Sequence, residues 1–235
     1  MIIAIETATT FGSVAAVDED QLLAEECMFV PQGHCESILP MLERMLSEAR
    51  IEMSSADAFA VSLGPGSFTA LRIGLSTAKA LSFSSGKPLV GVGTLDAIAY
   101  NVAGLCPYVC PIIDAKRGEV FYSVYRYRGG QLERLMEYAS DRPEKVAPKL
   151  LSLLAGAGQG NVAFLGDGVW LCREFIQTTV GERSLFPLYH LGIPRASSLG
   201  MLALKLFKQG RVDDTEKVEP IYVRRSDAEL RRERT

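Results

Sequence analysis

Short apolar segments separated by polar turns open the chain. Residues 2–5, 13–17 and 22–29 are rich in apolar side chains, and Thr, Gly and acidic residues lie between them at 9–12 and 18–20. Segments of this length with such turns predict three strands in an antiparallel meander. The same order of strands and turns is expected again in the second half of the chain, at 109–113, 120–127 and 132–138.

Helices are expected to alternate with strands after each meander. The first half should contain a helix at 36–49, a strand at 57–63, a helix at 69–83 and a strand at 88–92. The second half should contain a helix at 143–155, a strand at 161–165, and helices at 168–177 and 196–209. This mixed order predicts an α/β fold, and one repeat of about a hundred residues predicts two related subdomains rather than a solenoid. We place the boundary near Gly104, which gives subdomains 1–104 and 105–235, with the last helix free to pack back on the first.

The composition is that of an ordinary globular protein. The chain has 235 residues, of which 48% are hydrophobic and 23% charged, and its formal net charge of -3 provides no overall basic field for nucleic acid. No apolar run reaches the ~18 residues of a membrane span. The N-terminus lacks the features of a signal peptide. Five cysteines without a CxxC pair predict structural thiols in a reducing cytosol.

The segment 62–81 has the outline of a phosphate-binding loop. An apolar strand leads into Gly64-Pro65-Gly66 and then into a helix. A Walker loop would continue into Gly-Lys-Ser/Thr, which is absent from this segment. A Rossmann fingerprint would need a third Gly at the position of Thr69 and an acidic residue about 20 positions further on, and neither is present. Both nucleotide motifs therefore fail.

Nucleophilic catalysis finds equally little support. Ser67 would need a histidine base, and the chain has only His34 and His190, which must arrive from elsewhere in the sequence. His34 stands beside Gly33 before a helix, where a loop or capping role is expected, and His190 lies in a Pro-containing connection. We therefore interpret both histidines as structural.

Two neighbouring helices carry more apolar and small residues than one sheet requires. At 100° per residue, helix 69–83 has its only charges, Arg72 and Lys79, on nearly one line. A stripe of small residues on the same helix would let another helix approach closely, and it comprises Ala70, Gly74, Ala78 and Ser85. Helix 36–49 has an apolar arc of about 160°. Two interpretations stay open, a deep internal core or a patch for a partner subunit. The candidate interface residues are Leu39, Leu42, Met45, Leu46, Ala70, Ile73, Gly74, Thr77 and Ala78.

Five sequence motifs in a fixed order resemble one protein family. They are IAIETAT at 3–9, GHCE at 33–36, GPGSFT at 64–69 with RIG at 72–74, DAKRGEV at 114–120, and PIYVR at 220–224 with DAE at 227–229. The set covers essentially the whole chain, and the GPGSFT block is highly specific. Together these motifs resemble the TsaB (YeaZ) family of bacteria.

The resemblance implies an actin/Hsp70/sugar-kinase-like (ribonuclease-H-like) fold of two duplicated subdomains. It also implies a cytoplasmic protein that helps to form threonylcarbamoyladenosine on tRNA. Members of that family are noncatalytic and bring no cofactor. They pair with the catalytic paralogue TsaD, which carries the metal. The ATPase TsaE joins this complex, and the family protein contacts tRNA only as part of the complex. The pairing surface in the family corresponds to helices 36–49 and 69–83, and members often form homodimers through it when alone.

Two positions depart from the commonest family pattern. Glu6 stands where Asp is more usual, and Ala70 where Gly is more usual. The first departure weakens the case for an ATPase, because actin-like kinases use an Asp at this position to bind the metal. The alternative function, an independent actin-fold ATPase or glycoprotease-like peptidase, would rest on Glu6, Thr9 and Asp114.

A catalytic metal is not expected. The catalytic paralogue has an HxxxH helix, whereas the comparable segment 94–100 here contains no histidine. The tail at 224–235 has a small excess of Arg over acidic residues, which could touch tRNA or an acidic partner, although a solvated tail is the simpler expectation.

Overall fold

The computed structural model describes residues 1–19, 21–31, 33–157 and 160–224. These residues form two compact units, one comprising Met1–Ala97 with Pro194–Tyr222, the other Ile98–Ile193 with Val223 and Arg224. The change from one unit to the other falls within the short helix α3 (Thr94–Tyr100), some residues before the boundary placed near Gly104. Within the described ranges, no helix combines the length and the apolar character that crossing a membrane requires.

The first unit is built on a five-stranded sheet with the order β3-β2-β1-β4-β5. Its strands are β1 (Ile2–Glu6), β2 (Phe11–Asp18), β3 (Gln21–Phe29), β4 (Ala58–Gly64) and β5 (Leu89–Gly93). The first three strands pair antiparallel, as the meander pattern predicted, and β4 and β5 continue the sheet in parallel with β1.

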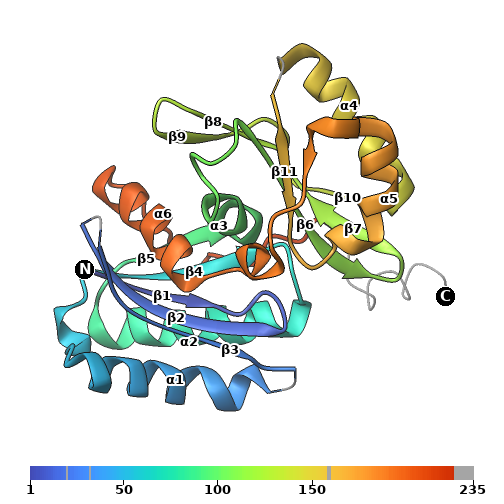
Figure 1. Cartoon of the computed structure of the whole chain (residues 1–235). Helices are drawn as coiled ribbons and strands as arrows, with labels where there is room; N and C mark the ends of the chain where they lie inside the picture. Colours follow the sequence, from blue (N-terminus) through green and yellow to red (C-terminus); the bar gives the residue numbers. More distant parts are fainter. Residues whose placement is uncertain (20, 32, 158–159, 225–235) are drawn as a thin grey trace. The chain divides into compact units, whose positions relative to one another are not determined.

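Helices cover both faces of this sheet. Helices α1 (His34–Ala49) and α2 (Phe68–Ser85) lie on one face, and α6 (Ala196–Lys208) lies on the other (Figure 1). Because side chains alternate along a strand, Ile3 and Ile5 pack with the α1 and α2 layer, whereas Ile2 and Ala4 pack with α6. Strand β1 is fully buried for this reason. A single 3-10 turn (Met53–Ser55) precedes β4.

The second unit repeats the arrangement. Its sheet has the order β10-β7-β6-β11-β12, with a hairpin of β8 and β9 joined to β6. The strands are β6 (Tyr108–Lys116), β7 (Glu119–Tyr122), β8 (Tyr125–Arg128), β9 (Gln131–Arg134), β10 (Ala139–Asp141), β11 (Val162–Leu165) and β12 (Ser184–Leu185). Helices α4 (Pro143–Ala157) and α5 (Val169–Val180) pack on one face of it. Two 3-10 turns follow, at Gly181–Arg183 and Tyr189–Gly192.

The two strand orders correspond one to one. Strand β6 takes the place of β1, β7 of β2, β10 of β3, β11 of β4 and β12 of β5, and helices α4 and α5 take the places of α1 and α2. The predicted duplicated α/β fold is therefore confirmed. Helix α6, whose place the sequence left open, packs on β1 and β2 of the first unit.

The second meander differs from its prediction. The strand expected at 120–127 is divided into β7 and β8. Both pair with β6, and the ladder is interrupted where β6 contains Pro111, which has no N–H to donate. In this gap the buried Ser123 hydroxyl donates a hydrogen bond to the Met136 carbonyl (2.6 Å). The strand expected at 132–138 ends at Arg134, and the neighbour of β7 is instead β10. Helix α3 and the two-residue strand β12 were not expected from the sequence.

Candidate functional site

The glycine-rich turn after β4 is filled by the protein's own backbone. A Cβ at Gly66 would overlap the carbonyl oxygen of Ala8 and lie 2.8 Å from the Ala8 side chain, and the Ser67 amide donates a hydrogen bond to that carbonyl (2.8 Å). Gly64 has a φ of +113°, which disfavours any residue with a side chain. The glycines are needed for chain packing, because the turn after β1 lies directly against them.

The second unit contains the same junction. Gly166 follows β11 with a φ of +112°, and a Cβ at Gly168 would lie 2.7 Å from the backbone of Ile113. The Gly168 amide donates to the carbonyl of Ile112 (3.0 Å). Both junctions pack closely against backbone, the turn after β1 in the first unit and β6 itself in the second, which indicates a structural requirement of the repeated fold.

The three candidates for the enzyme alternative all stabilise turns through hydrogen bonds to backbone amides. They are Glu6, Thr9 and Asp114. The Glu6 carboxylate accepts the amide of the residue two positions on (Ala8, 2.7 Å), and Asp114 does the same for Lys116 (2.7 Å). The Thr9 hydroxyl accepts the Phe11 amide (3.2 Å). Glu6 and Thr9 belong to the turn of the first unit, and Asp114 belongs to the corresponding turn of the second.

Glu6 is fully buried at the end of β1. Burial raises its pKa from 4.5 to about 7, although hydrogen bonds from the Ala8 amide and the Ser62 hydroxyl favour the charged form and limit the rise. Its Oε2 atom has no hydrogen-bond partner among the described residues.

Asp167 was missed by the sequence reasoning. Burial raises the pKa of its carboxyl group, and its Oδ1 accepts the backbone amide of Asp114 (2.9 Å). Among the described residues, no group of three or more His, Cys, Asp or Glu is placed to hold a metal ion. The expectation that the chain has no metal of its own stays a prediction.

His34 supports the turn after β1. Its side chain is buried, and its Nε2–H donates to the Thr9 carbonyl (2.8 Å). His190 is exposed in the 3-10 turn at Tyr189–Gly192. The two histidines therefore sit in different units.

Three of the four residues in the small stripe of α2 face their own sheet, whereas Ser85 at the end of the helix is exposed. Ala70, Gly74 and Ala78 are buried, and a Cβ at Gly74 would overlap the Thr7 hydroxyl and lie 3.3 Å from the Thr7 methyl group. The same hydroxyl donates to the Ala70 carbonyl (2.7 Å). These residues are small because α2 runs very close to β1, and a bulky residue at Gly74 would test folding rather than partner binding.

Three apolar residues of α1 in the candidate interface are also internal. Leu42, Met45 and Leu46 belong to the core between α1, α2 and the sheet. Of the nine candidate interface residues, only Leu39 (50% exposed) and the half-buried Ile73 and Thr77 reach the surface. The interface itself stays a prediction, and it can be formed only by accessible residues of this conformation.

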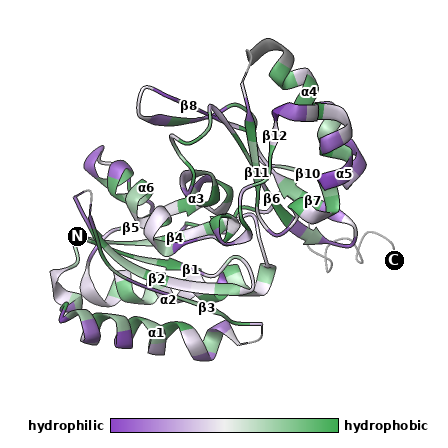
Figure 2. Ribbon diagram, in the orientation of Figure 1, coloured by the Kyte–Doolittle hydropathy of each residue, from purple (hydrophilic) through white to green (hydrophobic). Residues whose placement is uncertain are grey.

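Apart from Arg72 and Lys79 along one edge, the accessible face of α2 is uncharged. Its uncharged residues include Thr69, Ile73, Ser76, Thr77, Ala80, Phe83 and Ser84, of which Phe83 is 80% exposed. We call this set the α2 outer face. The sequence predicted little of this face, because the small residues at four-residue spacing on the opposite side of the helix gave a stronger signal for close helix packing. Helix α1 shows several hydrophilic residues along its length in Figure 2, whereas Leu39 is an exposed apolar residue among them.

One edge of the α2 outer face is basic. The Arg72 guanidinium lies over the Phe68 ring (3.9 Å), and its Nε donates to the Tyr222 hydroxyl (3.0 Å). Phe68 and Tyr222 also stack, with ring centroids 5.0 Å apart. Further along the helix, Lys79 Nζ donates to the Glu216 carbonyl (3.1 Å). These contacts hold the segment 216–222 against α2.

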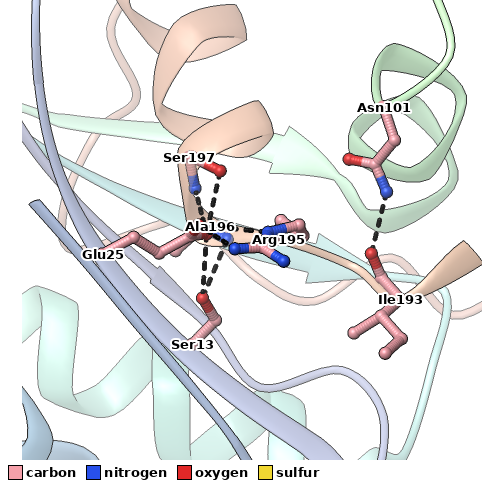
Figure 3. Close-up of polar contacts among 7 residues, drawn as sticks. All are labelled: Ser13, Glu25, Asn101, Ile193, Arg195, Ala196 and Ser197. Carbon is pink, nitrogen blue, oxygen red and sulfur yellow. Dashed lines mark hydrogen bonds and ion pairs between the residues drawn. The ribbon is translucent and has the colours of Figure 1, made fainter. Parts of the chain in front are cut away.

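A polar cluster fixes helix α6 to the opposite face of the first sheet. Glu25 on β3 forms an ion pair with Arg195 and accepts hydrogen bonds from the Ser197 amide (3.0 Å) and hydroxyl (2.8 Å) (Figure 3). The Ser13 hydroxyl accepts the Ala196 amide (3.2 Å). Burial raises the pKa of Glu25, but these hydrogen bonds outweigh burial and leave the pKa below its usual value.

The second group drawn in Figure 3 belongs to the other unit. There, the side-chain amide of Asn101 donates to the carbonyl of Ile193 (2.8 Å). It also donates to the carbonyl of Leu191 (2.8 Å), a residue that the figure does not draw. Arg224 at the end of the described chain pairs with Glu119 (3.1 Å) and donates to the Ala115 carbonyl (3.2 Å). The rest of the basic tail, and the DAE motif at 227–229, lie outside the described residues.

Comparisons with known proteins bear on the whole chain. Residues 28–232 match the family model of TsaD, tRNA N6-adenosine threonylcarbamoyltransferase. The chain is 28% identical over 230 residues to the Bacillus subtilis (strain 168) tRNA threonylcarbamoyladenosine biosynthesis protein TsaB, an alignment that covers 98% of this chain and 96% of the relative.

Solved structures agree with the sequence relatives. YeaZ from Pseudomonas aeruginosa superposes with a TM-score of 0.80 at 27% identity, covering 94% of this chain and 98% of that one. The ROK hexokinase from Thermus thermophilus superposes with a TM-score of 0.52 at 14% identity, covering 89% and 99%, and so shares the fold. The strand order, the two glycine junctions and these matches agree, and the chain belongs to the TsaB (YeaZ) family of tRNA threonylcarbamoyladenosine biosynthesis proteins.

Proposed function

We propose that this protein is the noncatalytic subunit that pairs with the catalytic paralogue TsaD during threonylcarbamoyl transfer to tRNA adenosine. Family membership supports the pathway. In this proposal the protein is cytoplasmic, the ATPase TsaE joins the pair, tRNA is met only through the complex, and the protein forms a homodimer through the same surface when alone.

The observation that carries the proposal is the α2 outer face. Apart from Arg72 and Lys79 along its edge, the accessible side of α2 carries no charge, although charged residues usually predominate on the accessible side of a surface helix. Ser76, Ala80 and Ser84 are small and four residues apart, and side chains of this size allow a second helix to pack closely. Phe83 and Leu39 add exposed apolar groups that a partner could bury.

The absence of a catalytic role is part of the proposal. Glu6 and Asp114 use their carboxylates to hold turns, and the glycine junction after β4 is occupied by the chain's own backbone. These roles leave an independent ATPase or peptidase without an accessible set of reacting groups at those positions.

Depletion of the protein in its host tests the proposed function. Threonylcarbamoyladenosine in tRNA, measured by mass spectrometry, should fall, and re-expression of the wild-type chain should restore it. Re-expression of Thr77→Arg should restore it poorly, because a bulky charge then lies in the α2 outer face. An unchanged level of the modified nucleoside after depletion would remove the protein from the pathway.

A further inference from the structure

A groove lies along the basic edge of the α2 outer face. Its cavity volume is about 270 Å³, and its walls are formed by Arg72, Leu75 and Lys79 on one side and by Val218, Pro220 and Tyr222 on the other. Ser76 lines the groove and also belongs to the α2 outer face. The groove is therefore continuous with the surface proposed above for the partner.

Arg72 is held in one orientation at the mouth of this groove. Its guanidinium stacks on Phe68 at 3.9 Å, and its Nε donates to the Tyr222 hydroxyl at 3.0 Å. Among the described residues, no carboxylate lies within ion-pair distance of Arg72, and its two terminal amino groups donate to none of them. A guanidinium that is already ordered loses little entropy when its remaining N–H groups bind an acceptor.

Lys79 adds a second positive charge at the same groove. It lies seven residues from Arg72, which places both side chains on nearly the same line of the helix. Its Nζ donates to the backbone carbonyl of Glu216 (3.1 Å), and its charge is one of the causes that lower the pKa of the nearby Asp214 carboxyl group. Glu219 also lines the groove, but it pairs with neither cation.

We propose that this groove receives an acidic side chain, Asp or Glu, of the protein that docks on the α2 outer face. The inference rests on the proposed function and specifies its partner further. A planar fork of N–H donors matches a carboxylate in a bidentate arrangement, and the adjoining uncharged face suits an apolar helix that carries the acid at its border. The ion pair fixes the position of the partner along α2, while the outer face contributes the buried apolar contact.

Replacement of the charge tests the proposal directly. Binding of purified TsaD from the same organism is measured by calorimetry without nucleotide for the wild-type chain and for Arg72→Met, which keeps the packing on Phe68. We expect Arg72→Met to weaken binding about tenfold or more, with a smaller dependence on salt. The affinity of Arg72→Lys should lie between those of the other two proteins, because lysine keeps the positive charge and lacks the planar pair of N–H donors. Glu219→Gln should bind slightly more tightly.

Lys208, exposed on the last turn of α6, provides the matched control. Lys208→Met should bind like the wild type. In addition, a carbodiimide joins an amine and a carboxylate with loss of water, so it should link Lys79 to one acidic residue of the partner. Peptide mass spectrometry would identify that residue, and Lys79→Met should abolish the link.

Four results would overturn the proposal. If Arg72→Met bound TsaD as tightly as the wild type, the proposed ion pair would be excluded, and the proposed function would be unaffected. Equal weakening by Lys208→Met would indicate general charge attraction instead of a site. If Arg72→Met weakened binding only after ATP was added, the anion would be a phosphate and not a carboxylate. Failure of the wild-type chain to bind at all would contradict the proposed function together with this inference.

Discussion

The two units place the same pair of helices on the same kind of sheet, yet the outer surfaces of the second helices differ. The first turn of α2 carries Phe68, which is 39% exposed and has Arg72 over its ring (3.9 Å). Beyond that turn, Phe83 is the one exposed aromatic residue of α2, and the charges of its accessible face, Arg72 and Lys79, lie along one edge. On α5 the corresponding surface carries Trp170 and Phe175, which are 61% and 42% exposed, and Arg173 lies over the Trp170 ring (5.2 Å). The duplication fixes the inner faces of both helices, so the outer faces are where the two halves are free to acquire different roles.

The inner faces differ at one position that explains the spacing of α2. Eight residues after the second glycine of each junction, α2 has Gly74 and α5 has Ile176. Both are buried, but Gly74 meets the Thr7 side chain whereas Ile176 contributes to a wider apolar core. Helix α2 therefore lies closer to its first strand than the side chain at the corresponding position of α5 would permit.

Gly74→Ile should have the largest effect on stability, because it gives α2 the side chain that α5 carries. Insertion of this volume against Thr7 should lower the free energy of unfolding by roughly 4 kcal/mol. Ser76→Ala on the outer face of the same helix should change it by less than about 0.5 kcal/mol. Urea unfolding measures both, and equal stability of Gly74→Ile and the wild type would contradict the close packing of α2 on β1.

Glu25→Ala should have the next largest effect. Its removal leaves Arg195 without its ion pair and the first turn of α6 without two hydrogen bonds, so the free energy of unfolding should fall by about 3 kcal/mol. Glu26→Ala on the same strand is the control, because its ion pair with Arg44 is exposed and should contribute less than about 1 kcal/mol. Similar losses of unfolding free energy in both variants would mean that the buried cluster at α6 stabilises the fold no more than an exposed ion pair does.

Glu6 and Asp114 compare the corresponding turns of the two units. The pKa of Glu6 is raised from its ordinary value of 4.5 to about 7 in the folded protein. Between pH 4.5 and about pH 7, the folded state therefore binds more protons than the unfolded state. The stability that Glu6 contributes is therefore complete below pH 4.5 and is lost as the pH rises through about 7. From about pH 5 to about pH 8 the free energy of unfolding should fall by about 2 kcal/mol.

Two substitutions isolate this effect. Glu6→Gln keeps an oxygen for the Ala8 amide and should largely remove the decline in stability between about pH 5 and about pH 8. Asp114→Asn, at the partly exposed counterpart, should leave that decline in place. A Glu6→Gln protein with the same pH profile as the wild type would show that Glu6 is not the titrating group. Urea unfolding at each pH provides the profile.

The sequence predicted most of the elements because their signals are local. The apolar segments at 2–5 and 13–17 are buried strands, and the fold class follows from the order in which strands and helices repeat. The outer face of α2 was harder to identify. Small residues at four-residue spacing fit a close sheet as well as a close partner, and only the contact between Gly74 and Thr7 distinguishes the two.

Contacts between distant parts of the chain gave no signal in the sequence. Glu25 and Arg195 are 170 positions apart, and neither lies in a recognisable motif. Arg72 and Tyr222 are 150 positions apart, and although each lies in a family motif, neither motif indicates that the two residues touch. The glycines after β4 were noticed, but their reason is the approach of the Ala8 backbone, which no spacing rule reveals.

The most direct test of the α2 docking surface compares two threonines. Thr77 on α2 and Thr178 on α5 each donate a side-chain hydrogen bond to the carbonyl four residues earlier, at 2.9 Å in both cases. Binding of TsaD is measured for Thr77→Arg and Thr178→Arg, with melting curves confirming that both proteins fold. We expect Thr77→Arg to weaken binding about 100-fold and Thr178→Arg to leave it unchanged. Equal binding by the two variants would contradict the account.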